Sequence, residues 1–146
     1  MHALNYNARM SMEFINKNIF IIAVALISGG MLIWPLLRRS AGGPWVNTLA
    51  ATQLINRNDA LVIDLRSSED YAKGHILGAR SIPLAELEKR AGELDKHKAK
   101  PLILHCGDGN RAGGAVAVLR KKGFDSVHNL AGGYTAWQQA GLPVEK

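Results

Sequence analysis

The hydrophobic positions divide the chain into an N-terminal stretch that is apolar throughout and a longer part in which apolar and polar positions alternate. From Ile19 to Leu37, nineteen consecutive residues carry no charge. A helix of that length is roughly 28 Å long, which matches the hydrocarbon thickness of a bilayer. The pattern predicts a transmembrane helix over 19–37, preceded by an N-terminal tail over 1–18.

The flanks of the apolar stretch favour a membrane anchor over two alternatives. Lys17 precedes it and Arg38 and Arg39 follow it, as is common at the ends of membrane spans. A cleaved signal peptide would have a shorter apolar region with a small-residue cleavage site directly behind it. A buried core helix that is apolar on every face would need a larger protein around it. The lipid bilayer is therefore the expected partner of residues 19–37.

The rest of the chain, after a short linker over 38–45, alternates between strand and helix signals. The short apolar run Leu61–Leu65, with its β-branched residues, and the segment Pro101–His105 predict buried strands of a mainly parallel sheet, and Val127–Leu130 is predicted as a third strand. The segments between them predict helices, at Thr48–Asn56, Ser68–Lys73, Leu84–Leu94, Arg111–Lys122 and Tyr134–Gln139, with Thr48 and Ser68 as N-caps. This alternation indicates one α/β domain over 46–146.

Charge and cysteine content narrow the function. The formal charge is +6, but residues 48–146 hold 14 Lys and Arg against 11 Asp and Glu. Half of the net charge thus comes from the flanks of the apolar stretch, and no nucleic-acid partner is expected. A single cysteine excludes an internal disulfide, a CxxC redox pair and a thiolate-rich zinc site.

The charges around the anchor also predict its orientation. Arg9 and Lys17, partly offset by Glu13, lie on one side, and the pair Arg38 and Arg39 lies on the other. The positive-inside tendency then places the C-terminal domain in the cytoplasm, a compartment that keeps a lone cysteine reduced. The expected location is the cell membrane, with a single pass and a cytoplasmic domain.

The chemistry is predicted at the loop from Cys106 to Arg111, which joins a strand to a helix. Ligands of open α/β sheets bind beyond the carboxyl ends of the strands, where Cys106 stands. Gly107 and Gly109 allow the loop to curl, so that its N–H groups and the following helix end form an anion-binding nest. We expect Cys106 to be largely thiolate in such a loop, and Arg111 to hold an anionic sulfur donor. A buried cysteine that merely ends a strand is the alternative.

The loop and four further segments resemble the single-domain rhodanese (thiosulfate sulfurtransferase homology) proteins over roughly 46–146. The resemblance rests on Val62–Arg66, Tyr71–Ile76, Gly78–Pro83, the Cys106 loop and Leu130–Tyr134, together with Trp137 and Gly141–Pro143. It implies an α/β fold with a five-stranded parallel sheet flanked by helices, and a catalytic cysteine that cycles through a persulfide. It implies no metal and no organic cofactor. It also implies that residues matching Asp64 and Arg66 lie near the active loop, where we expect them to support it.

The length and composition of the loop bear on the substrate. The resemblance implies that sulfurtransferases have six residues from the cysteine to the last loop position, as from Cys106 to Arg111, whereas related phosphatases need an arginine one position later, where this chain has Ala112. Many thiosulfate-using relatives carry a basic residue after the cysteine, where this chain has Gly107, and Asp108 adds a negative charge next to it. Asn110 completes the substrate-binding loop. Modest thiosulfate activity is therefore expected.

Two functions remain open from the sequence. The first is an enzyme that transfers sulfane sulfur through Cys106 from thiosulfate or another donor to a thiol or to cyanide. The second is a membrane-tethered binding or persulfide-carrier module with little turnover. With no second cysteine, Cys106 must pass its sulfur to an outside thiol or to cyanide, because no internal disulfide can resolve the persulfide. We expect His75 and His105 to be structural, Gly132 and Gly133 to permit a tight turn, and Trp137 to pack in the core.

Overall fold

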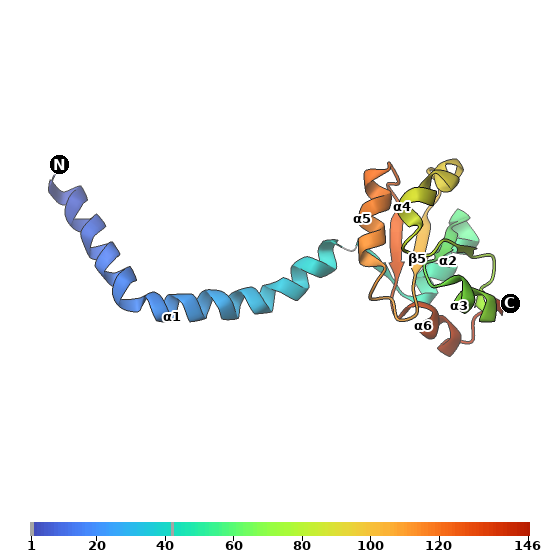
Figure 1. Cartoon of the computed structure of the whole chain (residues 1–146), viewed down its shortest axis with the longest axis horizontal. Helices are drawn as coiled ribbons and strands as arrows, with labels where there is room; N and C mark the ends of the chain where they lie inside the picture. The colour runs from blue at the N-terminus through green and yellow to red at the C-terminus, as the bar shows by residue number, and fades with distance from the viewer. Residues whose placement is uncertain (1, 42) are drawn as a thin grey trace. The chain divides into compact units, whose positions relative to one another are not determined.

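The computed structural model describes the backbone of residues 2–41 and 43–146, and the side chains of residues 12–34 and 43–146. It divides into two compact units, Met1–Arg38 and Arg39–Lys146, which are described separately (Figure 1).

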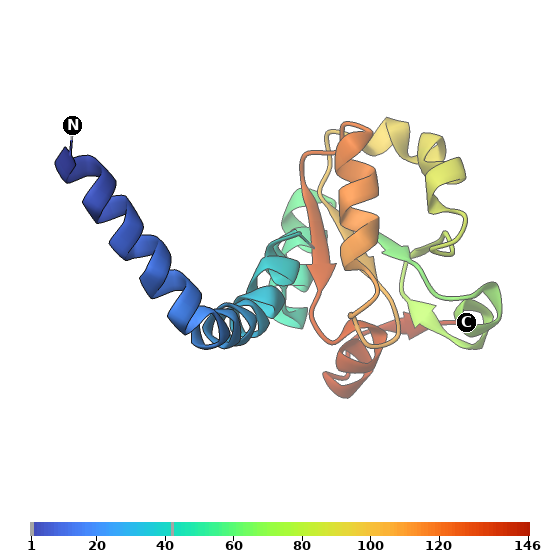
Figure 2. The same ribbon diagram turned by 60° about the vertical axis from the view of Figure 1, so that its left-hand side comes forward.

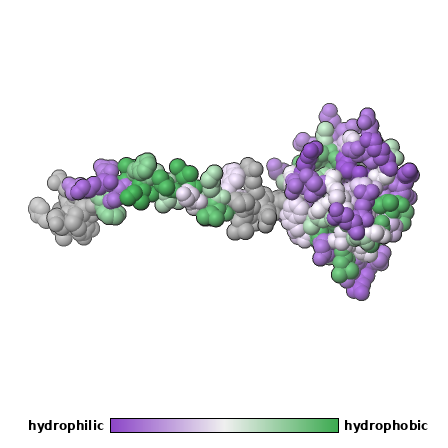
Figure 3. Space-filling view, turned by 90° about the horizontal axis from the view of Figure 1, so that it is seen from below, coloured by the Kyte–Doolittle hydropathy of each residue, from purple (hydrophilic) through white to green (hydrophobic). Residues whose placement is uncertain are grey.

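The first unit consists of one long helix, α1, which spans His2–Ala41. It includes the one helical segment of the described residues that is long and apolar enough to cross a membrane, Met12–Trp34, and Figure 3 shows the apolar side chains of this segment. The helix is longer than predicted at both ends. Its N-terminal extension contains no glycine or proline that would interrupt it, since residues 2–18 lack both. It also takes in Ser40 and Ala41 of the expected linker. The flanking side chains of Arg9, Arg38 and Arg39 lie outside the described residues.

The second unit is an α/β domain built on a five-stranded sheet. The strands are β1 (Trp45–Val46), β2 (Leu61–Asp64), β4 (Arg80–Ser81), β5 (Leu102–His105) and β6 (Val127–Leu130), and two further strands, β3 (His75–Ile76) and β7 (Val144–Glu145), pair separately. The helices are α2 (Thr48–Asn58), α3 (Ser68–Lys73), α4 (Leu87–Arg90), the 3-10 helix η1 (Ala91–His97), α5 (Gly113–Lys121) and α6 (Gly133–Gln139). The sheet order is β1-β6-β5-β2-β4, and every pairing in it is parallel. The predicted five-stranded parallel sheet is confirmed.

Alternating side chains of the central strands fill two separate cores. Leu102 and Leu104 of β5 pack with α4, η1 and α5 on one face of the sheet. Ile103 of the same strand packs with α2 and α6 on the other face, together with Trp137, as expected. Helices thus cover both faces, and the strand ends are the exposed parts of the sheet where a ligand can reach the backbone (Figures 1 and 2).

Several predicted boundaries are wrong by one or two residues, and the reasons are local. The N-caps of α2 and α3 are Asn47 and Ser67, since their side chains accept the N–H groups of residues three positions later. Helix α5 begins at Gly113 and not at Arg111. The predicted amphipathic segment Leu84–Leu94 forms the short helix α4 and continues as η1. The two-residue strands β1, β3, β4 and β7 were not predicted.

Candidate active site

Cys106 follows the last residue of β5, so its side chain lies at the carboxyl edge of the sheet, as predicted. Only 6% of the residue is exposed, but it lines an open cavity of about 470 Å³. The walls of this cavity are residues 65–67, Asp70 and Leu84 on one side and residues 106–108 and Arg111 on the other. The structure therefore brings Cys106, Arg66 and Arg111 to one cavity.

The loop after Cys106 is fastened to the start of α6 by backbone hydrogen bonds. The N–H of Tyr134 donates to the carbonyl oxygen of Cys106 over 3.0 Å. The Thr135 hydroxyl and N–H both donate to the carbonyl oxygen of Gly107, over 3.0 and 3.2 Å. From the sheet, Nδ2 of the buried Asn129 donates to the carbonyl oxygen of Gly109 over 3.4 Å. These contacts fix the path of the loop behind the thiol.

Two glycines allow this close approach. Gly109 has a φ of +82°, and a Cβ atom there would lie 2.9 Å from the carbonyl oxygen of Leu130. Gly133 has a φ of +55°, and its Cβ would overlap the carbonyl oxygen of Cys106 and lie 2.7 Å from the nitrogen of Gly109. Gly107 differs, because a Cβ there meets no atom within 4 Å. The backbone at residue 107 therefore does not need a glycine to curl, in contrast to the expectation from the sequence.

Asp108 places a carboxylate directly beside the sulfur. The thiol of Cys106 donates to Oδ1 of Asp108 over 3.4 Å. The N–H of Asn110 donates to Oδ1 over 3.1 Å, and its side-chain amide donates to Oδ2 over 3.2 Å. These bonds, first those of Asn110 and then that of Cys106, hold the pKa of Asp108 below its ordinary value. The N–H of Asn110, one backbone donor of the predicted anion-binding nest, is thus already bonded to Asp108. The negative charge of Asp108 stands next to the thiol.

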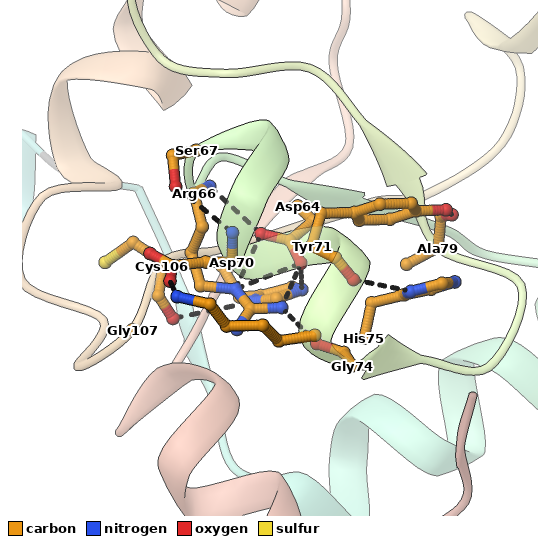
Figure 4. A network of polar contacts seen from close by, with 12 residues as sticks. Asp64, Arg66, Ser67, Asp70, Tyr71, Gly74, His75, Ala79, Cys106 and Gly107 are labelled. Carbon is orange, nitrogen blue, oxygen red and sulfur yellow. Dashed lines mark hydrogen bonds and ion pairs between the residues drawn. The ribbon is translucent and has the colours of Figure 1, made fainter. Parts of the chain in front are cut away.

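Asp64 and Arg66 form a buried ion pair at the end of β2 (Figure 4). The Asp64 side chain is fully buried, and it accepts from Nε and Nη2 of Arg66 over 3.0 and 2.6 Å and from the Arg66 N–H over 2.9 Å. Nη2 of Arg66 also donates to the carbonyl oxygen of Gly74 over 2.7 Å, and the guanidinium stacks 3.9 Å from the centre of the Tyr134 ring. The pair therefore joins β2 to α6, which holds the Cys106 loop.

The two histidines near the site have structural surroundings. His105 is fully buried, with Nε2 3.6 Å from Oδ2 of Asp64, too far for a hydrogen bond. Burial lowers its pKa, although Asp64 acts in the opposite direction, so the ring is neutral at neutral pH. His75 stacks on Tyr71 and lies 3.4 Å from the carboxylate of Glu145 in β7. Neither ring lines the cavity that holds Cys106.

The arrangement is suited to nucleophilic chemistry at sulfur. The thiol stands at the wall of an open cavity that is also lined by Arg66, whose guanidinium is paired with Asp64, and by the exposed Arg111. Within the described side chains, no group of three or more His, Cys, Asp or Glu residues is placed to hold a metal ion.

Comparison with known proteins identifies the family. The family model of the rhodanese-like domain matches residues 48–140. The chain belongs to the rhodanese-like domain family. A solved rhodanese-like domain from Anabaena sp. has a TM-score of 0.63 and 28% identity, and the match covers 70% of this chain and 78% of that one.

Three curated relatives of the rhodanese-like domain have different names. The uncharacterized protein YibN of Escherichia coli K12 is 41% identical over 95 residues, which are 64% of this chain and 66% of YibN. The thiosulfate sulfurtransferase GlpE of Pseudoalteromonas translucida is 31% identical, with 60% of this chain and 82% of GlpE covered. The putative sulfur carrier protein YrkF of Bacillus subtilis is 36% identical, with 64% of this chain and 50% of YrkF covered. The matched region thus spans half to four fifths of these proteins.

Several residues that shape the rhodanese-like site were not predicted to do so. Gly133 was assigned only to a turn, but it packs against the loop. Tyr134, Thr135 and Asn129, which hold the loop or its support, were given no role at the site. The sequence signal that could have found them is the segment Leu130–Tyr134, since its two glycines stand directly after a strand whose end lies next to β5.

Proposed function

We propose that this protein is a membrane-anchored sulfurtransferase in which Cys106 carries sulfane sulfur as a persulfide. The observation that carries the proposal is the position of the one cysteine of the chain at the wall of the cavity that Arg66 and Arg111 also line. The donor is thiosulfate or a persulfide, and the acceptor is a thiol or cyanide. The GlpE relative, which is named a thiosulfate sulfurtransferase, supports this class of reaction.

The transfer needs no oxidant. The Cys106 thiolate attacks the outer sulfur of thiosulfate, the S–S bond of the donor breaks, and sulfite leaves with the bonding electrons, so that Cys106 becomes a persulfide anion. A persulfide donor reacts in the same way and leaves as a thiolate. Cyanide then attacks the terminal sulfur and leaves as thiocyanate, or an acceptor thiolate attacks it and becomes a persulfide. In each case the Cys106 thiolate is regenerated.

Thiocyanate formation tests the enzyme directly. Full-length protein in detergent micelles should convert thiosulfate or a small persulfide with cyanide into thiocyanate, and Cys106→Ala should reduce the rate to that of the reaction without protein. Lys89→Gln, an exposed change in α4, is the matched control and should keep the wild-type rate. Full activity of Cys106→Ala would refute the mechanism.

The surroundings of Cys106 also support a second candidate, a persulfide carrier with little turnover. The carboxylate of Asp108 accepts a hydrogen bond from the thiol, and it repels an incoming dianion. The relative YrkF, named a putative sulfur carrier protein, is consistent with this role. Slow discharge to cyanide, together with rapid transfer to a thiol, would distinguish the carrier from the enzyme.

Removing the charge of Asp108 should change the choice of donor. We expect Asp108→Asn to raise kcat/KM for thiosulfate several-fold and to change the value for a singly charged persulfide donor by less, because the carboxylate repels the dianion more strongly than the monoanion. Gly107→Lys should also raise kcat/KM for thiosulfate, since the added lysine side chain would meet open space next to the cavity. Equal changes for both donors would contradict a role in selecting charge.

The proposed location is the cell membrane, with one pass and the rhodanese-like domain in the cytoplasm. It is supported by the apolar length of Met12–Trp34 and by the basic residues around it. A C-terminal alkaline-phosphatase fusion should be inactive and a green fluorescent protein fusion bright. A strongly active phosphatase fusion would reverse the orientation, and release of the protein by alkaline carbonate would contradict the anchor.

A further inference from the structure

Positive charge gathers at one edge of the rhodanese-like sheet. The edge where the strands begin carries the last turns of α2 and α5, the end of η1 and the segment that leads into β5. Seven cations lie there, against the three acids Asp59, Asp95 and Asp125. The part of the surface that carries the seven cations is called the basic edge below. The cations are Arg57, Lys96, Lys98, Lys100, Arg120, Lys121 and Lys122. The formal surplus of this edge is four positive charges.

Contacts of Lys98 and Lys100 join the ends of η1, α5 and α2, which carry these residues. Lys98 lies beside the end of α5: its Cε atom would be 3.9 Å from a Cβ atom placed on Gly123, which follows this helix. Lys98 also lies over the ring of Phe124, 5.5 Å from the centroid. Lys100 forms an ion pair with Asp59, which ends α2. Two of the three acids are thus occupied, since Asp95 pairs with Lys98 over 3.0 Å.

The opposite edge, which holds the Cys106 loop, has no such surplus. Residues 64–73 and 106–111 carry three cations and four acids. In Figure 2, β6 points toward α6 at this end, while η1 and the last turn of α5 lie at the other end of the sheet. The domain therefore has a positive edge where its strands begin and a nearly neutral edge at the catalytic cysteine.

The chain enters the domain at the basic edge. A Cβ atom on Gly43 would lie 3.3 Å from Nη2 of Arg120 and 3.4 Å from the carbonyl oxygen of Val127, the first residue of β6. Gly43 follows Trp34, the last residue of the apolar segment, by nine sequence positions, so the connection reaches at most about 32 Å even when fully extended. If the apolar segment is in a bilayer, the basic edge is held near the lipid headgroups at high effective concentration.

We propose that the basic edge docks on anionic lipid headgroups and that the Cys106 cavity consequently opens away from the membrane, toward the aqueous phase. The proposal rests on the membrane anchor proposed above. The anionic bilayer is the favoured partner because the attraction acts only within about one Debye length, roughly 8–10 Å, and the tether keeps this edge within reach of the surface. Sulfur would then be exchanged with soluble donors and acceptors.

The test is hydrogen exchange of the full chain in lipid nanodiscs. Neutral phosphatidylcholine discs are compared with discs containing roughly one third phosphatidylglycerol, at low salt. We expect the amides of residues 96–100 and 118–124 to exchange at least about threefold more slowly in the anionic discs. The rate at which an uncharged maleimide labels Cys106 should be equal in both, because the cavity faces water.

Two variants make the result specific. The triple change Lys96→Gln, Lys121→Gln and Lys122→Gln removes three exposed charges from the basic edge and should abolish the slowing. The matched change Lys73→Gln, Lys89→Gln and Lys146→Gln removes three exposed charges elsewhere and should retain it. Equal exchange of the wild type in the two kinds of disc would overturn docking while leaving the anchor standing. Failure of the chain to insert into neutral discs would overturn the anchor, and docking with it.

Discussion

Replacing Arg66 by methionine is expected to lower the free energy of unfolding by about 3 kcal/mol, because the fully buried carboxylate of Asp64 would lose its charged partner. Sulfur transfer should fall as well, since Arg66 lines the Cys106 cavity and its guanidinium stacks on Tyr134 at the start of α6. Urea unfolding of the full chain in a mild detergent measures the first effect, and thiocyanate formation under conditions where the variant is folded measures the second.

The double variant Asp64→Asn, Arg66→Met separates the charge from the packing. It should recover a large part of the lost stability, because the uncompensated buried charge is then absent. Arg66→Lys should be intermediate, since one ammonium group cannot reproduce the two parallel bonds to Asp64 and the bond to Gly74. A stability of Arg66→Met equal to that of the wild type would show that the pair does not support the site as described.

The second large effect is expected at Gly133, which lies outside the cysteine loop. Gly133→Ala should cost about 2 kcal/mol or more of stability and should remove most of the sulfur transfer. The added Cβ would overlap the carbonyl oxygen of Cys106 and stand 2.7 and 2.9 Å from backbone atoms of Gly109 and Gly107, at a φ that alanine rarely adopts. These are backbone atoms, so the loop itself must move.

Gly107→Ala is the matched control for this prediction. Residue 107 lies in the same loop, but its Cβ would meet open space and its φ is not in the left-handed region. We expect its unfolding free energy to stay within about 0.5 kcal/mol of the wild type and its sulfur loading to be retained. If Gly107→Ala were as damaging as Gly133→Ala, the packing of the loop on α6 would not be the reason.

The parts of the site that could be predicted from sequence are those encoded locally. Cys106, its glycines and Arg111 stand within six residues directly after a buried apolar run, so their chemistry and their place at a strand end follow from neighbouring positions. The strands β2 and β5 could be predicted for the same reason, because each begins with three consecutive apolar residues, whereas β6 has the polar pair His128 and Asn129 between Val127 and Leu130.

The parts that were not predicted depend on contacts between distant segments. The role of Gly133 follows only from its approach to Cys106, 27 positions away in the sequence. The strands β1 and β4 have two residues each and no periodicity, and they exist because they pair with β6 and β2. The contact of Asp108 with the thiol depends on how Asn110 holds its carboxylate. Such features need the assembled fold.

The central claim, a persulfide on Cys106, is tested most directly by the intact mass of the full chain after incubation with thiosulfate or a small persulfide. We predict a gain of one sulfur atom with at least one donor, its loss on addition of cyanide with release of thiocyanate, and no gain for Cys106→Ser. Because the chain has a single cysteine, the assignment of the added sulfur is unambiguous. No gain with either donor, or an equal gain in Cys106→Ser, would contradict the account.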